Sequence, residues 1–366
     1  MVTALPCPCL IVALGEGEKD HHPKKPFGGR LRGRKMDGSE AATRLWTRQG
    51  LSLRQALGAA LTGFNTLLLL FAALSILGAL FATWWHVLDL LAQFAIPALF
   101  AAGAVAIVET ARRHWTRSAL SLITGVVGVV TIWRSEPIAE CAPGVSTHRI
   151  VFFNIWVGNA ALAEALTYLE QSNADVIVLT ELTTRSANYF APLQKLYPHA
   201  TACAKNGTCW TTAFSRVPFT DVSSVLDLPG RSPALAAMRI SFPDGDVTVI
   251  GAHLTRPWPF DAITAQRRQV DALAKGLMSL PSPQLVVGDF NAVTWSSTVD
   301  ALVSATGLKP FPSWGTWMAG LPTPLRLPLD QAFVGEGIAC GSKTIGPELG
   351  SDHRPIIVDF ALKPPK

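Results

Sequence analysis

The feature that most constrains this chain of 366 residues is a run of 31 residues without a charged side chain, from Gln55 to Trp85. An α-helix needs about 20 apolar residues to cross the roughly 30 Å of hydrocarbon in a bilayer. The run is therefore long enough for a transmembrane helix, which we expect at about residues 57–83. The alternative is a helical hairpin buried inside a soluble protein.

Two shorter uncharged stretches follow. Leu90 to Val108 lies between two acidic residues and contains Pro97, which transmembrane helices tolerate. Ser118 to Trp133 has 16 residues, or about 24 Å at ~1.5 Å per residue, slightly short of the bilayer core. Arginines at both of its ends can reach the lipid headgroups. We expect helices at about 90–108 and 118–133, so that residues 55–134 form three transmembrane helices.

Charge is distributed unevenly along the chain. Residues 1–134 hold 14 Lys and Arg against 7 Asp and Glu, net +7, whereas residues 135–366 hold 17 against 19, net −2. Residues 1–50 are basic and show little hydrophobic periodicity, which predicts a disordered cytoplasmic tail. The C-terminal part has no excess of positive charge for binding a polyanion such as nucleic acid.

The connections between the apolar stretches predict their orientation. The first connection contains no Lys or Arg, and the second contains Arg112, Arg113 and Arg117. Because positive charge marks the cytoplasmic side, the order is inside, outside, inside. A third span then places the C-terminal domain outside the cytoplasm. If residues 118–133 lie on the membrane surface instead, the domain is cytoplasmic.

After a linker at residues 135–147 the pattern changes to short apolar runs separated by helical or turn-rich segments. Several runs are continuous in Val, Ile and Leu, as buried strands are. The pattern predicts an α/β domain over residues 148–362. We expect strands at His148–Trp156, Ala174–Thr180, Ala234–Phe242, Val247–His253 and Gln284–Val287, and helices at Ala160–Gln171 and Ile263–Met278.

Six cysteines are too few for a disulfide scaffold. Cys203 and Cys209 bracket a short loop whose Asn-Gly sequence is typical of a tight turn. They form either a disulfide or two free thiols, depending on the compartment.

The strongest chemical signal is the segment Val-Val-Gly-Asp-Phe-Asn-Ala, residues 286–292. Asp289 and Asn291 follow an apolar strand and stand two residues apart, so their side chains project to the same face. A carboxylate and a carboxamide then converge on one ligand. An Asx turn is the alternative for this segment alone.

A second segment, Ser-Asp-His-Arg-Pro at residues 351–355, precedes the last apolar run. Asp352 can ligate a hard cation, and His353 can donate a proton or a hydrogen bond to a phosphate. Glu181 ends one predicted strand, and Asn154 ends another. The ordered set is therefore Asn, Glu, Asp-x-Asn and Asp-His.

This set resembles the endonuclease/exonuclease/phosphatase superfamily of metal-dependent phosphoesterases, over about residues 149–360. The Gly-Asp-Phe-Asn-Ala and Ser-Asp-His-Arg-Pro segments match the two most specific motifs of that superfamily. The resemblance implies a two-sheet, four-layer α/β sandwich, with its active site at one edge of both sheets. In this chain the sandwich follows the predicted bundle of transmembrane α-helices.

The resemblance also implies roles for individual residues. Glu181 is expected to be the principal metal ligand, with Asn154 and Asp352 close to the metal, which is Mg²⁺ or Mn²⁺. Asp289 would deprotonate the attacking water while Asn291 holds it. His353 would stabilise the negative charge that develops on the phosphoryl group, and Asp330 would fix the orientation of the His353 imidazole.

Three further residues lie near these motifs. His253, in Gly-Ala-His-Leu-Thr-Arg-Pro, resembles a phosphate-contacting histidine of the phosphatase and sphingomyelinase branches, and the alternative is a core histidine. Arg256 belongs to the same segment. Arg267 lies on a predicted helix and faces either the substrate or solvent.

An anchored, exported domain of this kind resembles a bacterial branch that includes glycopeptide-resistance-associated membrane proteins. The resemblance implies a phosphodiester, phosphomonoester or pyrophosphate substrate, lipid-linked or not, that is hydrolysed at the membrane surface. An exported nuclease is the first alternative; the net charge and the lack of a match to the central Tyr of abasic endonucleases count against nucleic acid. A catalytically inactive membrane scaffold is the second alternative.

Overall fold

The computed structural model describes residues 52–133, 138–201, 209–222, 234–312 and 314–364. The chain divides into two units, residues 1–58 and residues 59–366. The basic tail at residues 1–50, predicted to be disordered, lies outside the described residues. The second unit contains the α/β domain and most of the apolar helices.

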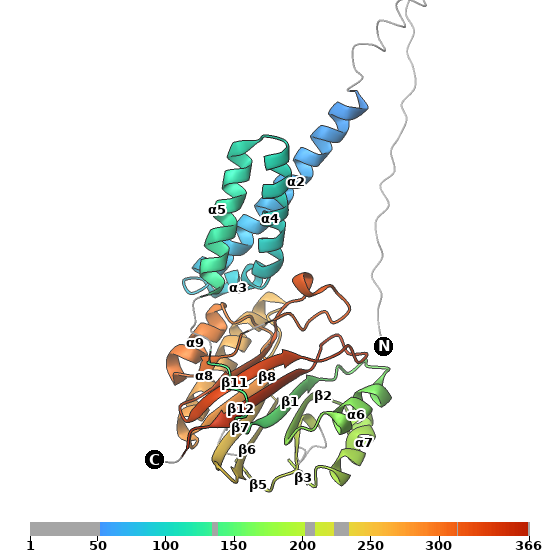
Figure 1. Ribbon diagram of the computed structural model, residues 1–366, viewed down its shortest axis with the longest axis vertical. Coiled ribbons are helices and arrows are strands. Elements are labelled where there is room, and N and C mark those ends of the chain that lie inside the picture. Colours follow the sequence, from blue (N-terminus) through green and yellow to red (C-terminus); the bar gives the residue numbers. More distant parts are fainter. Residues whose placement is uncertain (1–51, 134–137, 202–208, 223–233, 313, 365–366) are drawn as a thin grey trace, which may run out of the picture. The chain divides into compact units, whose positions relative to one another are not determined.

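Three long helices come from the apolar part of the chain (Figure 1): α2 (Leu53–Phe81), α4 (Ala95–Ala111) and α5 (Trp115–Ile132). Large apolar side chains such as Leu67, Ile107 and Val130 point outward and are exposed. The buried positions hold small residues, including Ala72 and Ala98, which let helices approach closely. By length and composition, α2 and α5 can each cross a membrane.

The helix expected at residues 90–108 is wrong in its first part. A 3-10 turn η1 (His86–Leu88) and a single α-helical turn α3 (Asp89–Ala92) come first, and α4 starts only at Ala95, at an angle of 51° to them. Pro97 therefore falls in the first turn of α4, where its missing N–H costs no hydrogen bond. The two segments together form either one broken span or a re-entrant loop.

The described part of the α/β domain forms two six-stranded mixed sheets. The first has the order β11-β12-β1-β2-β4-β3, with bounds Ile338–Ile345, Ile356–Leu362, His148–Asn154, Val176–Leu182, Cys209–Ser215 and His199–Ala200. The second has the order β5-β6-β7-β8-β10-β9, with bounds Phe219–Asp221, Ala234–Phe242, Gly245–His253, Gln284–Asp289, Asp330–Val334 and Lys309–Pro310. Only β1 with β2 and β7 with β8 pair in parallel among these described strands.

The two sheets face each other across one apolar core, to which Phe152, Val178, Met238 and Val287 contribute. Helices α6 (Leu162–Gln171) and α7 (Thr184–Phe190) cover the outer face of the first sheet. The helices α8 (Phe260–Ser279) and α9 (Ser297–Thr306) cover the second (Figure 1). The predicted two-sheet α/β sandwich is thus confirmed.

A disulfide joins Cys141, in the linker, to Cys340 on β11, 199 residues later. The linker runs beside the sheet here, because Gly341 N donates to Ala139 O at 2.9 Å. These two cysteines were not expected to pair. Cys203 and the side chain of Cys209 lie outside the described residues, so the alternatives of a disulfide and two free thiols both stay open there.

The apolar helices pack against the α/β domain through its loops. Val293, Trp295 and Leu329 belong to the same apolar cluster as the alanines of α2 and α4. Trp295 Nε1 donates a hydrogen bond to Ala92 O at 2.7 Å. The Asp89 carboxylate accepts four hydrogen bonds from Ser297 and Thr298, at the first turn of α9.

Candidate metal centre and active-site cleft

Strand pairing brings the predicted catalytic residues to one edge of the second sheet. Asp289, the last residue of β8, is level with His253 on β7 and with Asp330 on β10. The preceding residue must be glycine, because a Cβ on Gly288 would lie 2.1 Å from Ala252 O. The Gly-Asp pair therefore combines a close approach of two strands with a carboxylate at their end.

The first sheet supplies Asn154 at the end of β1 and Glu181 on β2. Asn154 Nδ2 donates to Glu181 Oε1 and to Asp289 Oδ2, at 3.0 Å each. Asn154 is fully buried, so one carboxamide links the two carboxylates across the facing sheets. This contact places the ligand sets of both sheets in a single site.

Two site residues have left-handed backbone conformations, Glu181 with φ 60° and Asn291 with φ 47°. This region is uncommon for residues other than glycine and carries a cost. At Asn291 the turn is closed by hydrogen bonds: its backbone N donates to Asp289 Oδ1 at 2.9 Å, and its Nδ2 donates to Leu254 O at 3.0 Å. The carboxylate and the carboxamide of the Asp-x-Asn segment are thereby held in fixed positions.

His353 and Asp330 form a buried pair, with His353 Nδ1 at 2.8 Å from Asp330 Oδ2. The other ring nitrogen, Nε2, lies 3.6 Å from Asp289 Oδ2. Burial lowers the pKa of His353, but the Asp330 and Asp289 carboxylates outweigh it and raise the pKa to about 10. The imidazole is therefore protonated at neutral pH and can donate from Nε2.

Asp289 is almost completely buried, and burial raises its pKa above the ordinary value. The protonated His353 acts in the opposite direction, as do His253 and the N–H of Asn291. A carboxylate with a raised pKa is a stronger base than an exposed one, which suits a group that removes a proton from water.

The residues fit a divalent cation. Glu181, His253 and Asp289 can each direct one ligand atom to a common point, with those atoms within 4.8 Å of one another, and Asp289, Asp330 and His353 form a second such group. Asp352 Oδ2 accepts a hydrogen bond from Trp317 Nε1 at 3.0 Å, while its buried Oδ1 has no partner within the described part of the chain. Carboxylate oxygens of this kind suit Mg²⁺ or Mn²⁺.

The centre lies in a cleft of about 1240 Å³. Glu181, His253, Asp289, Asn291 and His353 line it, together with Asp352. Four tryptophans also line it, Trp156, Trp210, Trp258 and Trp317. The remaining wall includes Leu90, Leu91, Gln93 and Phe94, from the segment between η1 and α4. Sequence reasoning missed these tryptophans and this wall.

The two predicted substrate-binding arginines lie in different places. Arg256 lines the cleft and is exposed. Arg267 lies on α8, where its Nη1 donates to Ser297 O at 3.0 Å and its Nε lies 3.6 Å from Asp271 Oδ1. The structure places Arg267 in the packing of α8 against α9 and outside the cleft, because its helical position directs it to α9.

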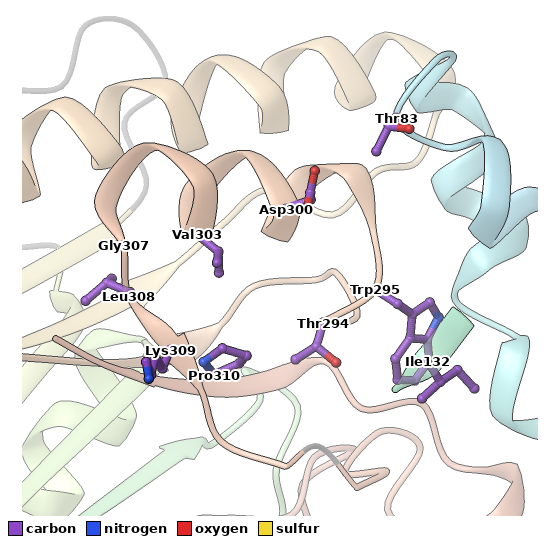
Figure 2. Close-up of a pocket in the computed structure, with 10 residues that line it drawn as sticks. All are labelled: Thr83, Ile132, Thr294, Trp295, Asp300, Val303, Gly307, Leu308, Lys309 and Pro310. Carbon is purple, nitrogen blue, oxygen red and sulfur yellow. The ribbon is translucent and has the colours of Figure 1, made fainter. Parts of the chain in front are cut away.

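A second pocket, of about 340 Å³, lies beside α9 (Figure 2). Trp295 and Ile132 lie together at one end of it, and Lys309 and Pro310 at the other. Its lining has one carboxylate, Asp300, and no imidazole. The acid and imidazole chemistry is therefore in the larger cleft.

Two facing mixed sheets, with carboxylates and imidazoles at or near the strand ends of both, define a two-sheet α/β sandwich with an acid-imidazole centre. The sequence profile of the Endonuclease/Exonuclease/phosphatase family matches residues 151–353, more than half of the chain. The chain belongs to this family, whose members are hydrolases that act on phosphoester bonds.

Solved structures resemble the chain at low identity. Sphingomyelinase C from Streptomyces griseocarneus is 15% identical, with 59% of this chain and 100% of that chain covered and a TM-score of 0.45. An endonuclease/exonuclease/phosphatase from Beutenbergia cavernae is 20% identical, with 60% and 72% covered and a TM-score of 0.45. One from Bacteroides vulgatus is 14% identical, with 60% and 100% covered and a TM-score of 0.49. No curated protein sequence matches the chain.

Proposed function

We propose that this protein is a membrane-anchored phosphoesterase that depends on Mg²⁺ or Mn²⁺. The observation that carries the proposal is the convergence of Glu181, Asp289 and the His353–Asp330 pair in one cleft, with Asn154 linking the two carboxylates. The reaction is hydrolysis of a phosphodiester, a phosphomonoester or a pyrophosphate.

Four tasks in the hydrolysis can be assigned to residues of the cleft, and the bond from phosphorus to the leaving group breaks as water attacks. Glu181 would hold the divalent cation, with Asp289, Asn154 and Asp352 close to it, and the cation would neutralise charge on the phosphoryl oxygens. Asp289 accepts the proton of the attacking water, in a place fixed by Asn291. His353 donates from Nε2 to the phosphoryl group as negative charge develops there. Asp330 keeps the imidazole protonated and oriented.

Anchoring is supported by α2 and α5, which are long and apolar enough to cross a membrane. The broken pair of helices between them would make a third crossing. With the basic tail inside, three crossings put residues 135–366 outside the plasma membrane of a bacterium. The Cys141–Cys340 disulfide favours the same side, because disulfides persist in oxidising compartments.

The test uses the purified full-length chain in detergent. We expect hydrolysis of at least one of p-nitrophenyl phosphate, bis-p-nitrophenyl phosphate and inorganic pyrophosphate with Mg²⁺ or Mn²⁺ present, loss of activity in EDTA, and recovery on metal addition. Hydrolysis that persists in EDTA would contradict the metal-dependent mechanism. Cleavage of DNA in preference to all three compounds would favour the nuclease alternative.

A further inference from the structure

One wall of the active-site cleft is built by the apolar N-terminal region. Leu90, Leu91, Gln93 and Phe94 line the cleft from the segment that joins η1 to α4. The side chains of Leu91 and Phe94 are 37% and 41% exposed. Apolar side chains thus face the same space as the metal centre, although a phosphoryl group needs none of them.

Another part of the cleft rim is aromatic. Trp156, Trp210 and Trp258 line the cleft and are 40%, 46% and 58% exposed. Large exposed apolar side chains that share one cleft suit the binding of an apolar group. Tryptophan is also the residue that accumulates where proteins meet the lipid headgroup layer.

The apolar wall is fixed relative to the metal centre. Asp89, next to Leu90, accepts hydrogen bonds from Ser297 N and Oγ at 2.7 Å each. Trp295 Nε1 donates to Ala92 O, and Gln93 Nε2 lies 3.5 Å from Asn291 O, in the Asp-x-Asn segment itself. The position of this wall is therefore determined by the same loops that position the catalytic side chains.

We propose that the cleft binds a phosphorylated lipid, with the phosphoryl group at Glu181 and Asp289 and the apolar chain along Leu91 and Phe94. This inference rests on the proposed function and adds its substrate class. A chain in this place would remove both side chains and the tryptophan rim from water, which is favourable at about 25 cal/mol per Å². Arg256 supplies a positive charge for the phosphate in the same cleft.

The occupant is a lipid chain for a reason visible in the fold. The wall belongs to the connection between α2 and α4, whose outward side chains, such as Leu67 and Ile107, are apolar and exposed. A substrate with an acyl chain suits a cleft whose wall continues into helices that we propose to be surrounded by lipid. A water-soluble substrate would leave the exposed surface of Leu91 and Phe94 in contact with water.

The experiment measures binding, so that it does not depend on which phosphoester is hydrolysed. The full-length protein in nanodiscs with Mg²⁺ is titrated with decylphosphonate and with ethylphosphonate, two non-hydrolysable phosphate analogues. The ratio of the dissociation constant of ethylphosphonate to that of decylphosphonate should fall about fivefold in Leu91→Ala, as expected for losing an apolar contact. Leu91→Ala keeps the Cβ that packs at Gly78. Leu120→Ala, on the exposed side of α5, is the matched control and should keep the wild-type ratio.

A second measurement locates the chain directly. Decylphosphonate with a terminal diazirine should crosslink to residues 86–94 on irradiation, and the adducts should decrease with excess decylphosphonate. Adducts on the outer face of α5 alone, or an equal fall of the ratio in Leu120→Ala and Leu91→Ala, would overturn the inference. If ethylphosphonate binds with Mg²⁺ and decylphosphonate binds no more tightly, the lipid subsite is overturned. The proposal of a phosphoesterase is then unaffected. Binding of neither compound would overturn both.

Discussion

Asp89 and Ser297 lie 208 residues apart, yet the Asp89 carboxylate accepts hydrogen bonds from both the backbone N–H and the hydroxyl of Ser297. Asp89 also accepts two hydrogen bonds from Thr298. Asp89 and Ser297 are both buried. Their contact joins the break in the apolar helices to the first turn of α9. The negative charge suits the positive end of that helix.

Replacing Asp89 should therefore destabilise the protein. In Asp89→Ala the N–H and hydroxyl groups of Ser297 and Thr298 lose a charged acceptor in a buried place, which costs about 2–4 kcal/mol of unfolding free energy. Thermal or chemical unfolding of the detergent-solubilised chain measures this. Asp300→Ala, in the same turn but exposed, is the control. Equal stability of the Asp89 variant and wild type would show that the contact contributes nothing.

Glu181→Ala should abolish turnover and weaken metal binding without unfolding the domain. Glu181 is half-buried at the edge of the cleft, and its carboxylate lies beside Asn154 and His253. Titration with Mn²⁺, read by calorimetry, should show at least a tenfold weaker affinity. Glu164→Ala, on the exposed side of α6, serves as a control. Full activity in Glu181→Ala would exclude Glu181 as a metal ligand.

Asp330→Asn should lower kcat much more than substrate affinity, because it changes the charge and tautomer of a group that acts in the transition state. The same variant should change the pH dependence of kcat in a definite direction. The carboxylate of Asp330 raises the pKa of His353, so activity that needs the protonated imidazole is retained up to high pH and lost near pH 10. In Asp330→Asn this pKa falls, and the alkaline limb of the pH–kcat profile should move to lower pH. An unshifted limb would show that Asp330 does not act on His353.

Removal of the Cys141–Cys340 disulfide should destabilise the α/β domain. The bridge closes a loop of 199 residues, and such crosslinks contribute about 2–5 kcal/mol. Cys340→Ser, or wild type in dithiothreitol, should unfold at a lower temperature than the oxidised chain. If reductant does not change the unfolding temperature, the bridge is not formed in the purified protein.

Sidedness is tested with reporter fusions at the C-terminus. Alkaline phosphatase is active only after export, and β-galactosidase is active only in the cytoplasm. Three crossings with a basic cytoplasmic tail predict an active phosphatase fusion and an inactive galactosidase fusion. The reverse pair of results would place residues 135–366 in the cytoplasm and make intracellular nucleotides or nucleic acid the expected substrates.

The sequence was informative where a polar side chain stands at the end of an apolar strand. Asn154, Glu181 and Asp289 each stand at or next to the end of an apolar run, and strand register then brings them together. Four layers and two sheets followed from the resemblance that these residues carry. The contacts that were missed join residues far apart in the chain: Asp89 with Ser297, and Cys141 with Cys340. No local pattern encodes such pairs.

The break before α4 was missed for a different reason. Leu90 to Ala95 is as apolar as its neighbours, and hydropathy cannot distinguish a continuous helix from two segments that bend at Gln93 and Phe94. The signal was Asp89, an acid directly before an apolar stretch, which needs a polar partner. The exposed tryptophans of the cleft were missed because exposure cannot be seen in a sequence.

The wall formed by Leu90, Leu91, Gln93 and Phe94 has a practical meaning for anyone who wishes to work with a soluble fragment. A fragment that starts after Cys141 would keep every acid and imidazole of the centre but would lose this wall, the acceptor of Trp295 and the partner of Cys340. The rate at which the fragment hydrolyses small esters would be the rate of a cleft that lacks one wall. Substrate preference measured on such a fragment would then belong to the fragment, and the selectivity of the whole enzyme would have to be determined in a membrane.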